Sequence, residues 1–151
     1  MAALTIAQLR AAGLAPASTD IPAYPGDIIL DFELDGSKLA VAAADTVDMF
    51  ELPALCGFIV KAAAITVLRP GTATGTIDVQ LVTTDVTGLT AWAADAAAGT
   101  KLVKLATAAN TAVNTGTATF IRLQQNTAAL GSGWIRVRVF GTLLQAPASQ
   151  T

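Results

Sequence analysis

The chain has 151 residues and a formal net charge of −2, with 53% hydrophobic residues, only 13% charged residues and no histidine. This length fits a single domain with its own core. Because no basic excess is present to neutralise phosphates, we expect no binding to nucleic acid or to anionic membranes. A single cysteine, Cys56, cannot form an internal disulfide, and without histidine the commonest metal ligand is missing, so we expect no metal and no cofactor.

The low charged fraction and a mean hydropathy of +0.57 predict an unusually apolar surface, covered by partner proteins or by further copies of the chain. The amino-terminal residues lack the basic and apolar regions of a secretory signal, so we expect the protein to remain in the cytosol where it is made. The longest apolar runs, residues 39–44 and 58–68, are too short to cross a bilayer.

The first sixteen residues differ in pattern from the rest, and residues 1–26 are predicted to form an N-terminal arm. Thr5 and Gln8 have the spacing of a capping box and Gly13 is a possible stop, which together predict a short amphipathic helix. That helix would carry Ile6 and Leu9. The prolines that follow indicate an extended path over the surface: Pro16, Pro22 and Pro25. The arm then either folds back on its own domain or reaches onto a neighbour.

From residue 27 onward the hydrophobic period becomes two, as in half-buried strands. The clearest strand covers residues 27–35, where Ile28, Leu30, Phe32 and Leu34 alternate with mostly acidic residues. Asp35-Gly36 is typical of a tight hairpin turn and predicts a return strand over residues 39–43. Further strands are predicted at 46–52, 58–68 and 77–81.

The second half is less regular. Residues 89–98 are rich in alanine and precede Gly99, which predicts a short helix with a glycine stop. Residues 101–105 form a short predicted strand, and residues 106–117 have the composition of a long loop. Two more strands complete the domain, with these residues facing inward: Thr119, Ile121 and Leu123, then Ile135, Val137 and Val139.

These elements amount to about eight or nine strands with turn signals between them and no alternation with long helices. The predicted class is therefore all-β, an antiparallel β-sandwich or jelly roll over residues 27–145. It follows the extended N-terminal arm at 1–26 and precedes a frayed tail at 146–151.

The residues offer little catalytic chemistry, and we expect no enzyme. Cys56 lies in an apolar context in which a thiol is an inert core residue. Four acidic residues share one face of the first strand, namely Asp27, Asp31, Glu33 and Asp35. They could bind Ca²⁺ or act as an acid–base pair, but a solvated strand face is the favoured interpretation.

One constellation is a candidate for binding to another protein. Trp134, Arg136, Arg138 and Phe140 share the outward face of the last strand, and aromatic and arginine residues are enriched at interface hot spots. The alternative is an ordinary outer face on which the rings lie over arginine stems. Stacked aromatics with arginines also suit single-stranded nucleic acid, although the pI near 4.8 argues against it.

The layout of the chain resembles the small head decoration, or cement, proteins of tailed bacteriophages. The resemblance is carried by the proline-punctuated arm, the Ala/Thr/Val-rich β domain, the Leu68-Arg69-Pro70-Gly71 turn, the loose segment at 106–117 and the closing Gly-Trp-Ile-Arg-Val-Arg-Val strand at 133–139. It covers roughly residues 25–145 and contains no diagnostic motif, so no binding residues are carried over.

The resemblance implies a capsid protein, commonly trimeric, that binds the outside of the major capsid protein shell and stabilises it against internal DNA pressure. The protein would then be made in the host cytoplasm and lie on the outer surface of the virion. We expect the arm, through Ile6 and Leu9, and one sheet face to contact neighbours. Two alternatives remain: another virion part, such as a head-fibre base or tail subunit, and a carbohydrate-binding or adhesion module that stacks sugars on Trp92 and Trp134.

Overall fold

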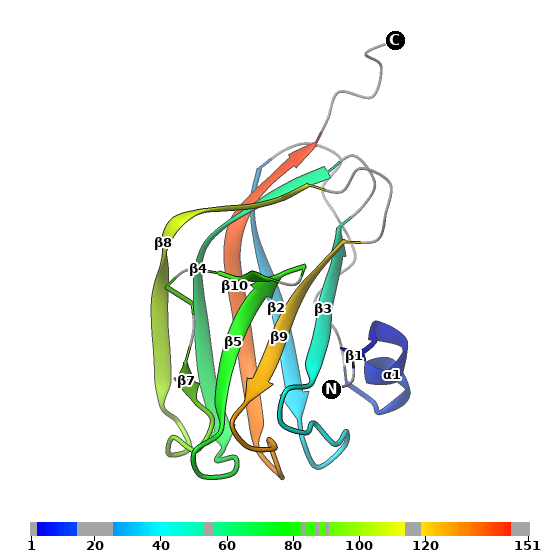
Figure 1. Ribbon diagram of the computed structural model, residues 1–151, viewed down its shortest axis with the longest axis vertical. Helices are drawn as coiled ribbons and strands as arrows, with labels where there is room; N and C mark the ends of the chain where they lie inside the picture. The colour runs from blue at the N-terminus through cyan, green and yellow to red at the C-terminus, as the bar shows by residue number, and fades with distance from the viewer. Residues whose placement is uncertain are drawn as a thin grey trace.

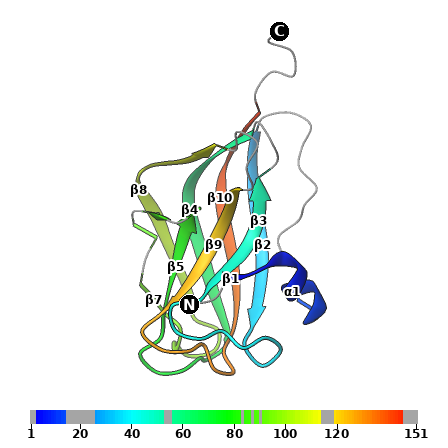
Figure 2. The same ribbon diagram turned by 45° about the vertical axis from the view of Figure 1, so that its right-hand side comes forward.

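The computed structural model describes residues 3–14, 26–52, 56–82, 84–86, 88–89, 91–113 and 119–145. Two β-sheets pack face to face (Figures 1 and 2). Sheet A has the order β1-β3-β9-β5-β6, with β7 also paired to β5, and sheet B has the order β2-β10-β4-β8. The elements are β1 (Ala3–Leu4), α1 (Ile6–Ala11), β2 (Gly26–Asp35), β3 (Thr46–Leu52), β4 (Cys56–Arg69), β5 (Thr76–Leu81), β6 (Thr84–Asp85), β7 (Trp92–Ala93), β8 (Lys101–Val113), β9 (Thr119–Asn126) and β10 (Trp134–Gln145).

The winding of the chain is that of a jelly roll. Going along the chain, β2 lies in sheet B, β3 in sheet A, β4 in sheet B and β5 in sheet A, and the alternation resumes with β8, β9 and β10. All pairs of long strands are antiparallel. This double Greek-key arrangement confirms the predicted antiparallel sandwich and selects the jelly roll among its forms.

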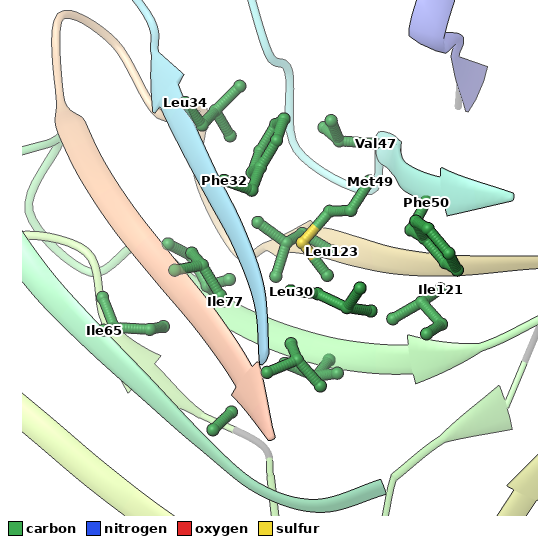
Figure 3. Close-up of a cluster of buried hydrophobic side chains, with 14 of the residues drawn as sticks. Leu30, Phe32, Leu34, Val47, Met49, Phe50, Ile65, Ile77, Ile121 and Leu123 are labelled. Carbon is green, nitrogen blue, oxygen red and sulfur yellow. The ribbon is translucent and has the colours of Figure 1, made fainter. Parts of the chain in front are cut away.

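The core lies between the two sheets and is filled by the inward-facing apolar side chains of their strands. On β2, Leu30, Phe32 and Leu34 are each at most 5% exposed. They meet side chains from the facing sheet in one apolar cluster, which includes Met49, Phe50, Ile77, Ile121 and Leu123 (Figure 3). Each fully buried side chain of this size contributes roughly 1.5–3 kcal/mol, so the alternation fixes which face of each strand points inward.

The described part of the arm folds back on its own domain. Helix α1 begins at the predicted capping box of Thr5 and Gln8, and Gly13, which follows the helix, has a φ of 76°. Strand β1 pairs in parallel with β3, and Leu9 is 0% exposed within the core cluster. The helix therefore docks through Leu9, because an isolated helix this short would be unstable. The prolines at 16, 22 and 25 lie outside the described residues.

The predicted hairpin after Asp35 is wrong. Strand β2 pairs with β10 instead, in the register Asp35 to Trp134. The Asp35 side chain accepts hydrogen bonds from the Ser37 backbone N–H at 2.9 Å and from its hydroxyl at 2.6 Å, which bends the chain away from a tight return. Residues 36–45 then cross irregularly to the other sheet, where β3 begins.

Two predictions for the second half are also wrong. Residues 91–98 contain no helix, because Trp92 is 1% exposed in the core and the short strand β7 pairs with β5. Burial of this ring overrides the helical preference of the alanines. Strand β8 runs on to Val113, since it must pair with the long strand β4, so the part of the predicted loop at 106–113 is strand.

The remaining loop residues, 114–118, and the tail at 146–151 lie outside the described residues. In the part of the chain that the structure describes, no helix is both long and apolar enough to cross a membrane.

Candidate protein-binding face

An apolar row crosses the outer face of sheet B. The register aligns Ile29 of β2 with Phe140 of β10, Phe140 with Ala62 of β4, and Ala62 with Leu105 of β8. Ile29 is 59% exposed and Leu105 is 70% exposed. In the adjacent row, Val103 is 67% exposed. These side chains therefore form a continuous apolar surface that faces away from the core.

This concentration of apolar groups is specific to one face. The large hydrophobic side chains exposed among the described residues are Ile29, Val82, Val103, Leu105 and Leu144, and all but Val82 lie on the outer face of sheet B. Single exposed apolar residues are ordinary, but a contiguous patch indicates a surface that binds another protein.

Ion pairs flank the apolar row on one side. The Arg136 guanidinium contacts the Asp31 carboxylate twice, with Nε 3.0 Å from Oδ1 and Nη2 2.5 Å from Oδ2, and Arg138 Nε lies 3.5 Å from Asp31 Oδ2. The hydrogen bond from Arg136 is the main reason that the pKa of Asp31 lies below its ordinary value. The Asp31 carboxylate therefore offsets one of the two arginine charges, and Glu33, directly opposite Arg136 in the register, offsets the other, which leaves little positive charge for phosphates.

Trp134 is held at the end of the same face. Its indole Nε1 donates to Glu33 Oε2 at 3.3 Å, and the Arg69 guanidinium lies 5.8 Å from the ring centroid. The ring thus lies over an arginine, as the alternative interpretation of this face expected.

A shallow pocket of about 350 Å³ opens next to the apolar row. It is lined by Asp27, Ile28, Ile29, Lys61, Phe140 and Gly141. A register shift between Phe140 and Gly141 marks a bulge at this point. Gly141 is required there, because a Cβ would meet the Ile59 carbonyl and the Phe58 ring.

Charged groups close the far side of the pocket. Asp27 Oδ1 lies 3.3 Å from Lys61 Nζ and accepts a hydrogen bond from the Thr142 hydroxyl at 2.6 Å. The hydrogen bond from Thr142, followed by Lys61, lowers the pKa of Asp27. The pocket therefore combines an apolar floor with a neutralised polar rim.

The outer face of sheet A is different in character. Its side chains bond to one another in a polar ladder: Arg122 pairs with Asp48, the Gln80 amide donates to Asp85 and to Gln124 at 2.7 Å each, and Asn126 donates to Asp78 at 2.6 Å. A face whose polar groups are already satisfied within the chain gains little from a partner. The outer face of sheet B is thus the better candidate for binding.

The four acidic residues of β2 do not form a cation site. Asp27, Asp31 and Glu33 engage Lys61, Arg136 and Trp134 respectively. Asp35 does not share their solvated face; it is 6% exposed and bound to Arg69 Nη2 at 2.7 Å. Among the described residues, no three His, Cys, Asp or Glu side chains gather as a metal site would require.

The structure brings together four of the six predicted site residues. Trp134, Arg136, Arg138 and Phe140 lie on the outer face of sheet B, whereas α1 lies beside β3, on the opposite side of the molecule from β8 (Figures 1 and 2). Ile6 is partly buried there and Leu9 has no accessible surface, which corrects the expectation that Leu9 contacts a neighbour.

The predicted site omitted Ile29, Val103 and Leu105. The available signal was the run from Lys101 to Leu105, which carries apolar residues on both faces of the strand and so leaves some of them exposed.

Comparison with known proteins gives structural matches alone. No family model and no curated protein matches the sequence. The fold is similar to a chain in the capsid of Ralstonia phage GP4, with a TM-score of 0.51 and 16% identity over 89% of this chain and 92% of that one. It is also similar to a chain of the cyanophage Pam1 capsid asymmetric unit, with a TM-score of 0.51 and 19% identity over 85% of this chain and 92% of that one. Both matches show a common fold, and because they cover most of each chain, the matched chains are close to this one in length.

Proposed function

We propose that the protein is a structural component of a bacteriophage virion that decorates the capsid, where it binds the outer surface of the major capsid protein shell and stabilises it. The observation that carries this proposal is the similarity of nearly the whole jelly roll to chains of about the same length in two phage capsids. Both matches cover most of the matched chain as well as most of this one.

The surface chemistry supports a structural role. The outer face of sheet B presents exposed apolar side chains with neutralised ion pairs beside them, as expected at a protein interface. We assign the protein no catalytic activity, no cofactor and no nucleic-acid or membrane partner. In this proposal it is made in the host cytoplasm, associates with copies of itself and ends on the outer capsid surface. The resemblance implies a trimer.

The alternatives differ in how well they fit. A carbohydrate-binding module would need Trp92 as a stacking platform, but this ring is 1% exposed. A head-fibre base or tail subunit would have the same fold and composition, and only the location in the virion separates it from a decoration protein.

The experiment is co-sedimentation of the purified full chain with phage heads that lack it, followed by a heat-release assay of the packaged DNA. We expect the protein to pellet with the heads at a fixed ratio and to raise the temperature at which DNA escapes. If the protein stays in the supernatant but joins tails or fibres, it is another virion part and the decoration proposal fails.

A further inference from the structure

We propose that the outer face of sheet B packs against the same face of a second copy of the chain, related to the first by a two-fold axis parallel to the strands. This contact deepens the proposed function, because it names a second copy of the chain as the partner that covers this face. It rests on the proposed function only for the premise that copies of the chain associate. Three features of the described residues support it: the apolar row, the distribution of charge and the position of the pocket.

The apolar row is complementary to itself. A row here is a set of residues aligned across the four strands by the register. Rotation about an axis parallel to the strands leaves the position of each row along the strands unchanged and places β8 of the second copy over β2 of the first. Leu105 of the second copy then faces Ile29, and Ala62 of the second copy faces Phe140, because the register puts all four side chains in one row. Aligned sheets pack within about 30° of parallel, so the rows stay close to one another across the interface.

The charges on the two outer strands are complementary. The outward positions of β2 carry three carboxylates, of which Asp27 and Asp31 already pair with Lys61 and Arg136 within the chain. The third, Glu33, bonds to the neutral Trp134 indole, and the outward charge on β8 is Lys101. Glu33 and Lys101 share one row, since Glu33 aligns with Arg136, Arg136 with Thr66 and Thr66 with Lys101. The same rotation that matches the apolar rows therefore sets Glu33 opposite Lys101 of the second copy, twice in the pair. Such complementarity fixes the register of an interface.

The pocket and the most exposed leucine are also placed to meet. The pocket lies beside Ile29 and Phe140 at the β2 side of the face, and Leu105 projects from β8 at the other side, 70% exposed. Rotation brings Leu105 of each copy to the pocket of the other. An apolar side chain that fills a pocket on its partner excludes water and contributes a large share of binding energy, and here two such contacts form, one at each side of the face.

A contact of this kind is isologous and closes after two copies. It gives a dimer or an even multiple of it, rather than the trimer that the resemblance implies, so the mass of the free protein separates the two possibilities.

The test is light scattering on the full chain over a concentration series, with Leu105→Glu as the disrupting variant and Val82→Glu as its control. Val82 is 39% exposed and lies off this face, so both variants place one charge on an already exposed apolar position. We expect the mass of the parent and of Val82→Glu to be that of an even number of copies, and the mass of Leu105→Glu to fall to half. A monomeric or trimeric parent, or a Leu105→Glu protein of unchanged mass, would overturn the inference.

A charge exchange tests the register itself. Glu33→Lys and Lys101→Glu should each weaken the pair, because each sets like charges opposite one another, and the double variant should restore it. If the double variant is as weak as the single ones, the two residues do not face each other.

Co-sedimentation with heads keeps this inference separate from the proposed function. A dimer that never pellets leaves the inference standing and removes the decoration role. A monomeric parent that pellets, with loss of pelleting in Leu105→Glu, assigns the face to the shell and overturns the inference alone.

Discussion

Arg136 reaches diagonally across the β10–β2 pair to Asp31, although the residue directly opposite it in the register is Glu33. Asp31 thereby serves both Arg136 and Arg138, and Glu33 bonds instead to the Trp134 indole through one of its two oxygens. A compact, neutral cluster results, with Glu33 at its edge. Glu33 is the carboxylate of this cluster whose hydrogen bond comes from a neutral group, and it is the one that the proposed two-fold contact sets opposite Lys101.

The pairing of Asp31 predicts a specific dependence of stability on pH. The pKa of Asp31 is lowered from its ordinary value of 3.8, first by the hydrogen bond from Arg136, so its contribution is present at neutral pH and is lost as the pH falls through the folded-state pKa. The side chains of Arg136 and Asp31 are 40% and 39% exposed, which limits the contribution to about 1 kcal/mol or less.

Urea unfolding of the parent and of Asp31→Asn checks this. The parent should be slightly more stable at pH 7, and the difference should shrink as the pH is lowered below the ordinary carboxyl pKa of 3.8. A difference that persists unchanged in acid would mean that Asp31 acts through something other than its charge.

Because the N-terminal helix docks through Leu9, truncating this side chain should strongly lower the stability of the whole domain. Leu9 is 0% exposed in the core, so Leu9→Ala should lower the free energy of unfolding by about 2–5 kcal/mol. Ile6→Ala on the same helix is the control and should cost less, because Ile6 is only partly buried. If Leu9→Ala unfolds at the same urea concentration as the parent, the helix does not dock in solution.

Sequence patterns correctly predicted strands in which apolar and polar residues alternate. They failed where strand pairing or burial depends on residues that are distant in the sequence. Strand β2 was predicted because its apolar residues all face one side, but its partner is β10, about a hundred residues later, and the local Asp35-Gly36 signal carries no information about that. The alanine-rich segment was predicted as helix because nothing local shows that Trp92 fills the core. Only the tertiary structure supplies that constraint.

The candidate site was predicted in part for the same reason. Alternation on the last strand alone placed Trp134, Arg136, Arg138 and Phe140 on one outward face, as the structure has them. The apolar row was not foreseen, since its residues come from separate strands and align only through the register of sheet B.

The polar ladder on sheet A predicts a strong effect from breaking a buried ion pair. Asp48 and Arg122 are 5% and 19% exposed, so Arg122→Met leaves a buried carboxylate without its cation and should cost on the order of 3 kcal/mol. Lys61→Met at the exposed pair with Asp27 is the matched control and should cost far less, because solvent screens an exposed pair.

A second substitution at the same pair separates charge from packing. Combining Arg122→Met with Asp48→Leu should recover much of the loss, because an apolar pair has no unpaired charge. If the double variant is less stable than Arg122→Met alone, Asp48 contributes chiefly through contacts other than this pair.

The two tryptophans of the chain should report on opposite environments. Trp92 is 1% exposed in the core, whereas Trp134 lies partly exposed on the outer face of sheet B. In Trp134→Phe the remaining emission should be blue-shifted and resist quenching by acrylamide, and in Trp92→Phe the remaining emission should be readily quenched in the free, dilute protein. Quenching of Trp134 should then decrease as the concentration rises, because a second copy covers its face. Light scattering on the same samples shows over which concentrations the copies associate. If quenching in Trp92→Phe does not change over that range, the copies associate through a different surface.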